Sequence, residues 1–255
     1  MIRIRVIPIL LINNNKLIKT IKFNKATYIG DPINAVKIFN EKEVDEIIIV
    51  DMSPTIEEKN PSYKLITELA SECFMPMCYG GGITTIDEIK KIINSGVEKV
   101  AINSAANSKN SLITDAANVF GSQSVVVSID VKKNWLGKYT VFTHSGKVNT
   151  KKDPLGYAKE MENRGAGEIL LNSIDRDGTF TGYDTELIQY VSQNISIPVI
   201  ACGGAGKMED FVKAVNNGAS AVAAGSLFAF HGKHRAVLIN FPSQEELKET
   251  FSNKF

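Results

Sequence analysis

The sequence predicts a single (β/α)8 barrel, and three observations favour this fold class. Eight short, β-branched apolar segments alternate with longer amphipathic segments along the 255 residues. The short segments are apolar throughout, which is typical of parallel strands covered by helices. The chain also repeats itself at about half its length. Eight strand–helix units in about 250 residues match the usual size of this barrel, and a doubly wound open sheet is the structural alternative.

The expected strands occupy residues 4–11, 46–51, 75–79, 99–102, 125–130, 168–172, 198–201 and 221–224. Helical periodicity predicts helices over residues 32–39, 63–73, 86–94, 112–120, 155–164, 186–193, 208–216 and 244–251. Several of these helices carry terminal signals. Thr85 and Glu88 have the spacing of a capping box, and Gly96, Gly165 and Gly218 lie where a glycine commonly ends a helix.

Two Gly-Gly turns, one in each half of the chain, indicate an internal repeat. Gly81 and Gly203 are separated by 122 residues. The same offset separates Glu46 from Glu168, Gly96 from Gly218, and Ser104 from Ser226. Solenoid repeats have periods of roughly 20–50 residues, so a repeat of this length indicates a duplicated half-domain instead. We expect one closed barrel over residues 1–255, with half-barrels at about 1–120 and 121–240 and a last helix after 242.

Composition excludes several classes of partner. The 29 basic and 28 acidic residues leave a net charge of +1, so no global field favours nucleic acid or a membrane. Cys73, Cys78 and Cys202 have no metal-ligand spacing and suit a reducing compartment. The apolar runs are too short to span a bilayer, and the N-terminal run contains charges that a signal peptide lacks. We therefore expect a cytoplasmic protein with no metal site and no cofactor.

Each Gly-Gly turn follows an expected strand and precedes an expected helix, a place where free backbone N–H groups can bind phosphate. The first group of candidates comprises Gly82, Asn103 and Ser104. The second comprises Gly203, Gly204, Gly225 and Ser226, to which we add Asp177 and Gly178 after the sixth strand. The alternative is that the glycines only allow tight turns. Because the arrangement recurs in both halves, it predicts a phosphorylated small molecule with two anionic ends.

Three aspartates follow strands on the side where a barrel carries its active site. Asp130 ends the fifth strand, Asp51 ends the second, and Asp175 follows the sixth. A lone Asp at such a position is often a helix cap, but three around one mouth favour an acid–base role, with Asp130 as the catalytic candidate. His144, His231 and His234 share no motif, and we do not expect them to be catalytic.

At the opposite ends of the strands, four charged residues replace the apolar residues expected there. They are Arg5, Glu46, Lys99 and Glu168. Two acids and two bases at the same rim of the barrel, on strands one, two, four and six, can form a closed ring of ion pairs, while a solvated rim is the simpler interpretation. Spacing alone leaves both open.

Several longer motifs resemble the cyclase subunit of imidazole glycerol phosphate synthase. They are Ile7-Pro8, Gly80-Gly-Gly-Ile83, Ala101-Ile-Asn-Ser-Ala105, residues 120–130 and 165–171, Ser173-Ile-Asp-Arg-Asp-Gly-Thr179, Gly182-Tyr-Asp184 and residues 197–206. That family is a (β/α)8 barrel that partners a glutamine amidotransferase. Ammonia from the partner enters the bottom of the barrel, passes along its axis and reacts at the top with an intermediate that carries two phosphates.

The resemblance implies roles for the candidates already named. The two glycine-containing groups look like the family's two phosphate sites, and the four charged residues look like the gate at its ammonia entrance. Asp130 looks like one of its two catalytic aspartates. The other is missing, because the family reads Ile-Pro-Cys-Leu-Asp where this chain reads Ile7-Pro-Ile-Leu-Leu11. Loss of one acid–base partner costs about 10²–10⁴ in rate.

Other positions near the mouth also depart from the family. Thr20 replaces a Gly, Asn172 replaces a Thr, Cys202 replaces a Ser, and residues 230–242 differ from histidine-pathway members. The combination resembles a divergent branch that occurs with surface-polysaccharide genes. There the barrel works with a glutaminase and a separate sugar amidotransferase to form an acetamidino group on a sugar.

Three functions follow as hypotheses. The first is an ammonia-conducting subunit for amidino-sugar synthesis, with a glutaminase and a sugar amidotransferase as partners. The second is a cyclase subunit of histidine biosynthesis, a lyase, that tolerates Leu11. The third is a barrel that binds or regulates a glutaminase without any flux of its own.

Overall fold

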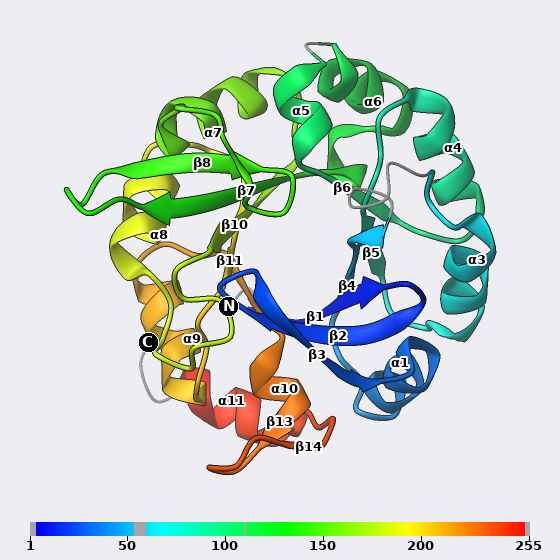
Figure 1. Cartoon of the computed structure of the whole chain (residues 1–255), viewed down its shortest axis with the longest axis vertical. Coiled ribbons are helices and arrows are strands. Elements are labelled where there is room, and N and C mark those ends of the chain that lie inside the picture. The colour runs from blue at the N-terminus through cyan, green and yellow to red at the C-terminus, as the bar shows by residue number, and fades with distance from the viewer. Residues whose placement is uncertain (1–3, 54–59, 110, 253–255) are drawn as a thin grey trace.

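The computed structural model describes residues 4–53, 60–109 and 111–252. Within them the chain forms a closed barrel of eight parallel strands surrounded by helices (Figure 1). The barrel strands are β1 (Arg5–Asn13), β4 (Ile47–Asp51), β5 (Met77–Gly80), β6 (Lys99–Ile102), β7 (Val125–Lys133), β10 (Glu168–Ser173), β11 (Val199–Cys202) and β12 (Ala221–Ala224). They follow one another in chain order, and the β12–β1 and β7–β10 pairs complete the circle. The predicted fold class is therefore confirmed.

The helices over the barrel form where the periodicity predicts them. They are α1 (Pro32–Glu41), α3 (Tyr63–Glu72), α4 (Ile86–Asn94), α6 (Leu112–Phe120), α7 (Pro154–Asn163), α8 (Thr185–Ser192), α9 (Met208–Asn216) and α11 (Gln244–Ser252). Asp31 and Asp153 cap α1 and α7, each followed by a proline at the start of the helix. No helix of the described residues is long and apolar enough to cross a membrane.

The capping devices recur at the repeat offset. At the start of α4, the Glu88 carboxylate accepts from the amide N–H groups of Thr84 at 2.7 Å and Thr85 at 2.9 Å. At the start of α9, the Asp210 carboxylate accepts from the amides of Gly206 at 3.0 Å and Lys207 at 3.2 Å. Both helices therefore begin in the same way after a Gly-Gly turn.

Three extensions beyond the strand–helix units were not predicted. The hairpin of β2 (Lys16–Ile21) and β3 (Asn24–Gly30) follows β1, the strands β8 (Tyr139–Thr143) and β9 (Val148–Asn149) follow β7, and the pair β13 (Phe230–His231) and β14 (Ala236–Val237) follows β12. Two short helices, α5 (Ser104–Ser108) and α10 (Ser226–Ala229), and the 3₁₀ turn η1 (Ser122–Ser124) were also missed. The polar run Asn13-Asn-Asn15 forms the turn between β1 and β2, where Asn14 and Asn15 have positive φ.

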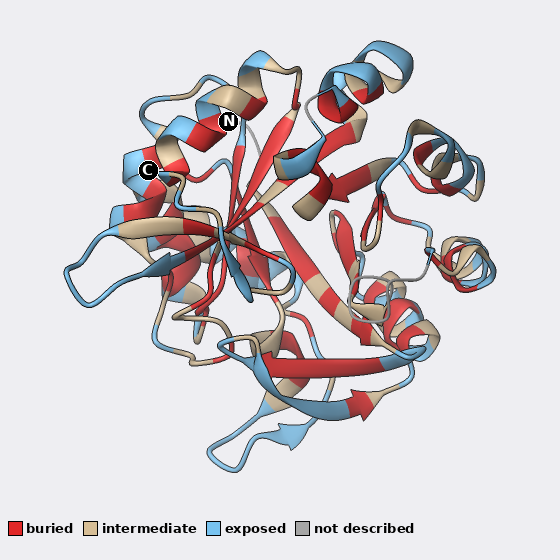
Figure 2. Cartoon of the chain, turned by 45° about the horizontal axis from the view of Figure 1, so that its top comes forward, coloured by how far each residue is buried: buried red, intermediate tan, exposed pale blue. Residues whose placement is uncertain are grey.

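Apolar side chains pack in two separate layers. The larger cluster lies between the strands and the helices, and Figure 2 shows the buried inner faces of those helices. The smaller cluster fills the barrel interior and consists of Ile7, Ile48, Cys78, Ala101, Val126, Leu170, Ile200, Cys202, Ala221 and Ala223. Half of these interior residues are Ala or Cys, so the barrel axis is lined by unusually short side chains.

Candidate active site

The C-terminal ends of the strands surround a cavity of about 470 Å³. Its lining includes Leu11, Asp51, Gly80, Ile102, Asp130, Asn172, Cys202 and Ala224, one from each barrel strand. This is the end at which (β/α)8 enzymes bind their substrates, and the volume suits a small molecule. All of the predicted phosphate-binding residues line the cavity.

The first glycine-containing turn lies beside the Asn103-Ser104 turn because β5 and β6 are neighbours. Gly81 has φ of 139°, and a Cβ atom there would lie 2.1 Å from the carbonyl oxygen of Asp51, so this position requires glycine. The amide N–H groups of Gly82 and Ser104 have no acceptor among the described residues. Two such amides beside a cavity can bind an anion.

The second turn has the same construction on the opposite wall, between β11 and β12. A Cβ atom at Gly204, where φ is 112°, would lie 2.2 Å from the carbonyl oxygen of Gly182. The amides of Gly204 and Ser226 are without an acceptor in the part of the chain that the structure describes. A ligand that spans the cavity could therefore contact both turns.

Lys19 gives the second turn a cation. Its Nζ atom donates to the carbonyl oxygen of Ile9 at 2.5 Å and lies 2.2 Å from the place that a Cβ atom would take at Gly225. Burial lowers the pKa of Lys19 to about 8, and the nearby Asp177 carboxylate offsets part of that effect. The absent side chain at Gly225 thus makes room for the ammonium group.

Asp130 lies across the barrel from Leu11, since β7 and β1 are four strands apart in the closed order. Its two carboxylate oxygens accept from the side-chain amides of Asn172 at 3.2 Å and Asn103 at 3.1 Å. Burial raises the pKa of Asp130 to about 7, although these two hydrogen bonds act in the opposite direction. A carboxyl group with a pKa near neutrality is suited to accept and return a proton.

The β2–β3 hairpin is attached to the loop after β10 at the edge of the cavity. The Asp177 carboxylate accepts from the Thr20 hydroxyl at 2.9 Å and the Phe23 amide at 3.4 Å. A Cβ atom at Gly178 would lie 2.2 Å from the carbonyl oxygen of Thr20. Asp177 and Gly178 thus hold the hairpin, and their contribution to phosphate binding stays a prediction.

The other aspartates considered for acid–base chemistry have structural partners. Asp51 accepts from the Ser53 amide at 2.9 Å and the Tyr79 hydroxyl at 3.3 Å, while still lining the cavity. Asp175 accepts from the Lys133 amide at 2.7 Å and does not line the cavity. Of these three aspartates, Asp51 and Asp130 reach the cavity, and the catalytic role of Asp130 stays a prediction.

Sequence reasoning missed several residues of the cavity wall. Lys19, Phe23, His144 and Ser145 all come from the unpredicted extensions. The His144 amide donates to Ser104 Oγ at 3.1 Å, so the turn after β8 reaches the first glycine-containing group. The positive φ of His144 and Ser145 before Gly146 marks this tight turn, which a Ser-Gly signal could have indicated.

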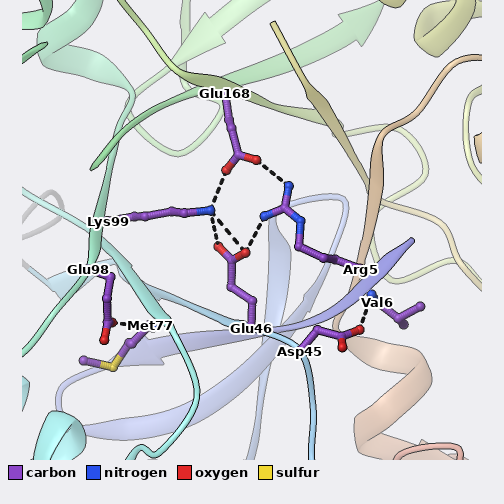
Figure 3. Close-up of polar contacts among 8 residues, drawn as sticks. All are labelled: Arg5, Val6, Asp45, Glu46, Met77, Glu98, Lys99 and Glu168. Carbon is purple, nitrogen blue, oxygen red and sulfur yellow. Dashed lines mark hydrogen bonds and ion pairs between the residues drawn. The ribbon is translucent and has the colours of Figure 1, made fainter. Parts of the chain in front are cut away.

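At the other end of the barrel, Arg5, Glu46, Lys99 and Glu168 form a closed ring of ion pairs, here called the charged ring (Figure 3). Arg5 contacts both glutamates, and Lys99 Nζ lies 3.1 Å from Glu46 and 2.8 Å from Glu168. The Glu46 side chain is only 3% exposed. The arrangement is the closed ring rather than the solvated rim.

The pKa values of Arg5, Lys99 and Glu168 are shifted toward the charged state. Burial acts to lower the pKa of Arg5 and Lys99, but the hydrogen bonds and charges of the two glutamates outweigh it and raise both. Burial acts to raise the pKa of Glu168, but Arg5 and Lys99 lower it. The two acids and two bases therefore neutralise one another at the N-terminal end of the strands.

The fold and the site define a (β/α)8 barrel with two facing glycine-containing turns at the mouth and a charged ring at the base. A sequence model of the family described as "Histidine biosynthesis protein" matches residues 5–235. Hence the chain is a histidine-biosynthesis-type barrel in both sequence and fold.

Individual relatives narrow the class. The protein provisionally named imidazole glycerol phosphate synthase subunit hisF2 of Pseudomonas aeruginosa is 53% identical over 97% of this chain and 99% of that protein. Proteins provisionally named subunit HisF are 47% identical in Leptospira borgpetersenii and 46% identical in Leptospira interrogans, each over 98% of this chain and 100% of its own length. The chain belongs to the HisF family.

Proposed function

We propose that this chain is the barrel subunit of a glutamine-dependent ammonia-transfer system. A glutaminase subunit docks on the charged ring, ammonia passes along the barrel axis, and the mouth delivers it for amidino-sugar synthesis. Membership of the HisF family supports a glutaminase partner, because the relatives are named as subunits of imidazole glycerol phosphate synthase.

The barrel interior supports a path for a small neutral molecule. Between the charged ring and the mouth, the lining consists of apolar side chains, and Ala101, Ala221 and Ala223 are among the smallest. Neutral ammonia loses little solvation in such a lining, whereas ammonium would leave its hydration shell without an ion partner. The lining therefore favours transfer of NH₃ over NH₄⁺.

The single observation that carries the proposal is the contrast between the two ends of the barrel. The charged ring is complete, but Leu11 lies across from Asp130 where a second carboxylate would be needed for cyclisation. Leu11 is part of the cavity wall and cannot transfer a proton. Asp130 can serve only one of the two proton transfers in a mechanism with two carboxylates.

The alternative is a cyclase subunit of histidine biosynthesis, and the two phosphate-binding turns favour it. An intermediate with two phosphates would fit turns on opposite walls of one cavity. Asp130 would act as acid or base, and water would have to replace the second carboxylate. The pKa of Asp130, about 7, is compatible with either pathway.

Complementation of a histidine auxotroph separates the two. The host lacks its own cyclase subunit but keeps its glutaminase, and it receives either this chain or a family member with the strand-one aspartate. We expect growth without histidine only with the second protein. Growth with this chain at a comparable rate, at equal expression, would support the histidine-pathway alternative.

A further inference from the structure

Three extensions leave the barrel at the C-terminal end of its strands and are here together called the crown; residues of the first two line the cavity. It comprises residues 13–30, 131–152 and 230–240, about a fifth of the chain. These segments follow β1, β7 and β12, so all three leave the barrel at its C-terminal end (Figure 1). The crown therefore faces whatever approaches the cavity.

The crown is strongly basic although the whole chain is nearly neutral. It contains 12 of the 29 basic residues and none of the 28 acidic residues. They are Lys16, Lys19, Lys22, Lys25, Lys132, Lys133, Lys138, Lys147, Lys151, Lys152, Lys233 and Arg235. Ten of them are exposed. Among the described residues, only Lys133 and Lys152 of this set form ion pairs, with Glu186 and Glu160 respectively. The rest of the chain has 17 basic and 28 acidic residues, so the charge is segregated.

The crown also carries exposed apolar side chains. Of the ten large exposed hydrophobic residues described, seven belong to the crown. They are Ile21, Tyr28, Trp135, Leu136, Val148, Val237 and Leu238. Trp135 is 91% exposed and Leu136 is 70% exposed. A fifth of the chain thus holds most of the apolar side chains that face solvent, which is typical of a binding surface.

The turn that carries Trp135 is stabilised by hydrogen bonds of Asn134. Asn134 Oδ1 accepts from the amides of Leu136 at 3.0 Å and Lys138 at 2.9 Å, and the Asn134 amide donates to the carbonyl of Lys138 at 2.9 Å. Behind the turn, the Lys133 ammonium lies 4.8 Å from the Tyr139 ring and pairs with Glu186. A large apolar side chain on a preorganised turn loses little entropy on binding.

We propose that the crown is the docking surface of an acidic protein that takes ammonia at the mouth, an inference that rests on the proposed function. Such a partner would cover the opening and keep ammonia from solvent. Its acidic rim would pair with the unpaired lysines, and an apolar recess would take Trp135 and Leu136.

Charge segregation favours a protein over an anionic membrane or a nucleic acid. All 28 acidic residues lie outside the crown, so a partner that contacts the crown alone meets no acidic side chain of this protein. A lipid plane would seal the cavity from any phosphorylated ligand. A protein of limited size can contact the basic crown alone and leave the more acidic remainder of the chain in solvent.

Trp135 is the only tryptophan, so it permits a direct test. A photo-crosslinking residue at position 135 captures the partner in cells, and the same residue at Val119, which is 60% exposed on α6, is the control. The captured protein is identified by mass spectrometry, purified, and titrated against the chain. We expect an acidic ammonia-using enzyme, a blue shift of Trp135 emission, and binding that weakens steeply with salt.

Substitution separates the docking surface from the conduit. Trp135→Ala with Leu136→Ala should weaken binding at least tenfold and reduce glutamine-dependent product, while Val119→Ala should change neither. Normal binding by the double variant, or capture equal at both positions, would overturn the proposal. So would an emission shift with phosphatidylglycerol vesicles and none with a protein. Docking without transfer of glutamine nitrogen would support the crown as a docking surface and contradict the ammonia conduit. Transfer of glutamine nitrogen that persists in the double variant would support the conduit and contradict the role of the crown.

Discussion

The Nζ atom of Lys19 lies 2.2 Å from the place that a Cβ atom would occupy at Gly225. The ammonium group therefore uses the space that glycine leaves beside the second glycine-containing turn. Its other neighbour is the carbonyl oxygen of Ile9, which accepts its hydrogen bond. The position of the Lys19 ammonium group at this wall of the cavity therefore depends on glycine at position 225.

Gly225→Ala should displace Lys19 and weaken sulfate binding at the second turn about tenfold, comparable to losing one charge-assisted hydrogen bond of about 1.5 kcal/mol. Isothermal titration with sulfate measures the effect, and a crystal soaked in sulfate should show anions at both turns of the unmodified chain. Gly156→Ala, on helix α7 with its nearest neighbour 3.7 Å from the added carbon, is the matched control. Unchanged sulfate affinity in Gly225→Ala would contradict the prediction that the second turn and Lys19 bind an anion.

Sulfate affinity should fall as the pH rises from 6 to 9. Sulfate keeps its charge over this range, but Lys19 loses its proton around pH 8 and Asp130 becomes negative around pH 7. Both changes remove positive potential from the cavity. Titrations of Lys19→Met and Asp130→Asn should each show a smaller loss of affinity across this range than the unmodified chain. A flat profile for the unmodified chain would show that neither group faces the anion.

Asp130 also makes stability depend on pH. Its pKa is raised in the fold, so the neutral carboxyl is favoured there, and this contribution is complete below the unfolded pKa near 3.8 and lost as the pH rises to about 7. The unmodified chain should therefore lose about 2–3 kcal/mol relative to Asp130→Asn between pH 5 and pH 8. Urea unfolding of both proteins at the two pH values measures the difference. An equal change in the free energy of unfolding of both proteins would show that the Asp130 carboxylate is solvated in the fold.

Sequence patterns predicted the barrel well because its elements obey local rules. The strand at residues 99–102 is short and mostly apolar. Helix α4 begins at a capping box formed by Thr85 and Glu88, whose spacing is visible in the sequence. Sequence patterns did not predict the extensions because their strands are short and largely polar, as in β3, where only Ile29 is buried. They become ordered through distant contacts, such as that between Thr20 and Asp177, which no local pattern records.

The candidate site was predicted unevenly for the same reason. Residues at strand ends, such as Asp130 and Ser104, were found because the topology fixes where strands end. The role of Lys19 was missed because its burial depends on how the β2–β3 hairpin folds back over the mouth. The closure of the charged ring required the relative angles of four strands, which spacing alone does not give.

Lys99→Ala should open the charged ring. Loss of one partner of a buried ion pair costs about 3–5 kcal/mol, and since Lys99 keeps 19% exposure we expect about 1–3 kcal/mol of destabilisation. We also expect glutamine hydrolysis by the docked glutaminase to become uncoupled from product, with ammonia appearing in solution. Lys91→Ala, an exposed substitution on α4, is the control. Unchanged docking and transfer in both Lys99→Ala and Glu46→Ala would refute the assignment of the ring as the ammonia entrance.

Leu11→Asp should restore part of the missing acid–base pair. The new carboxyl group would lie across the cavity from Asp130, and two carboxyl groups in different environments can divide proton removal from proton delivery. We expect cyclase turnover to rise by a factor of about ten or more, within the range of general acid–base catalysis. The substitution places a charge among apolar neighbours, so a stability loss of about 1–3 kcal/mol is expected and is measured separately. Leu11→Asn, which adds polarity without a titratable group, should not raise turnover.

The most direct test of the central claim is the cyclase turnover of the unmodified chain with the bisphosphorylated intermediate of the imidazole pathway and free ammonium. Free ammonium bypasses the glutaminase and the charged ring, so the assay reports only on the chemistry at the mouth. With Leu11 in place of the second carboxylate, we predict turnover at least 10²-fold below that of a family member with both aspartates. Turnover equal to that of such a member would contradict the account and establish the chain as a histidine-pathway cyclase.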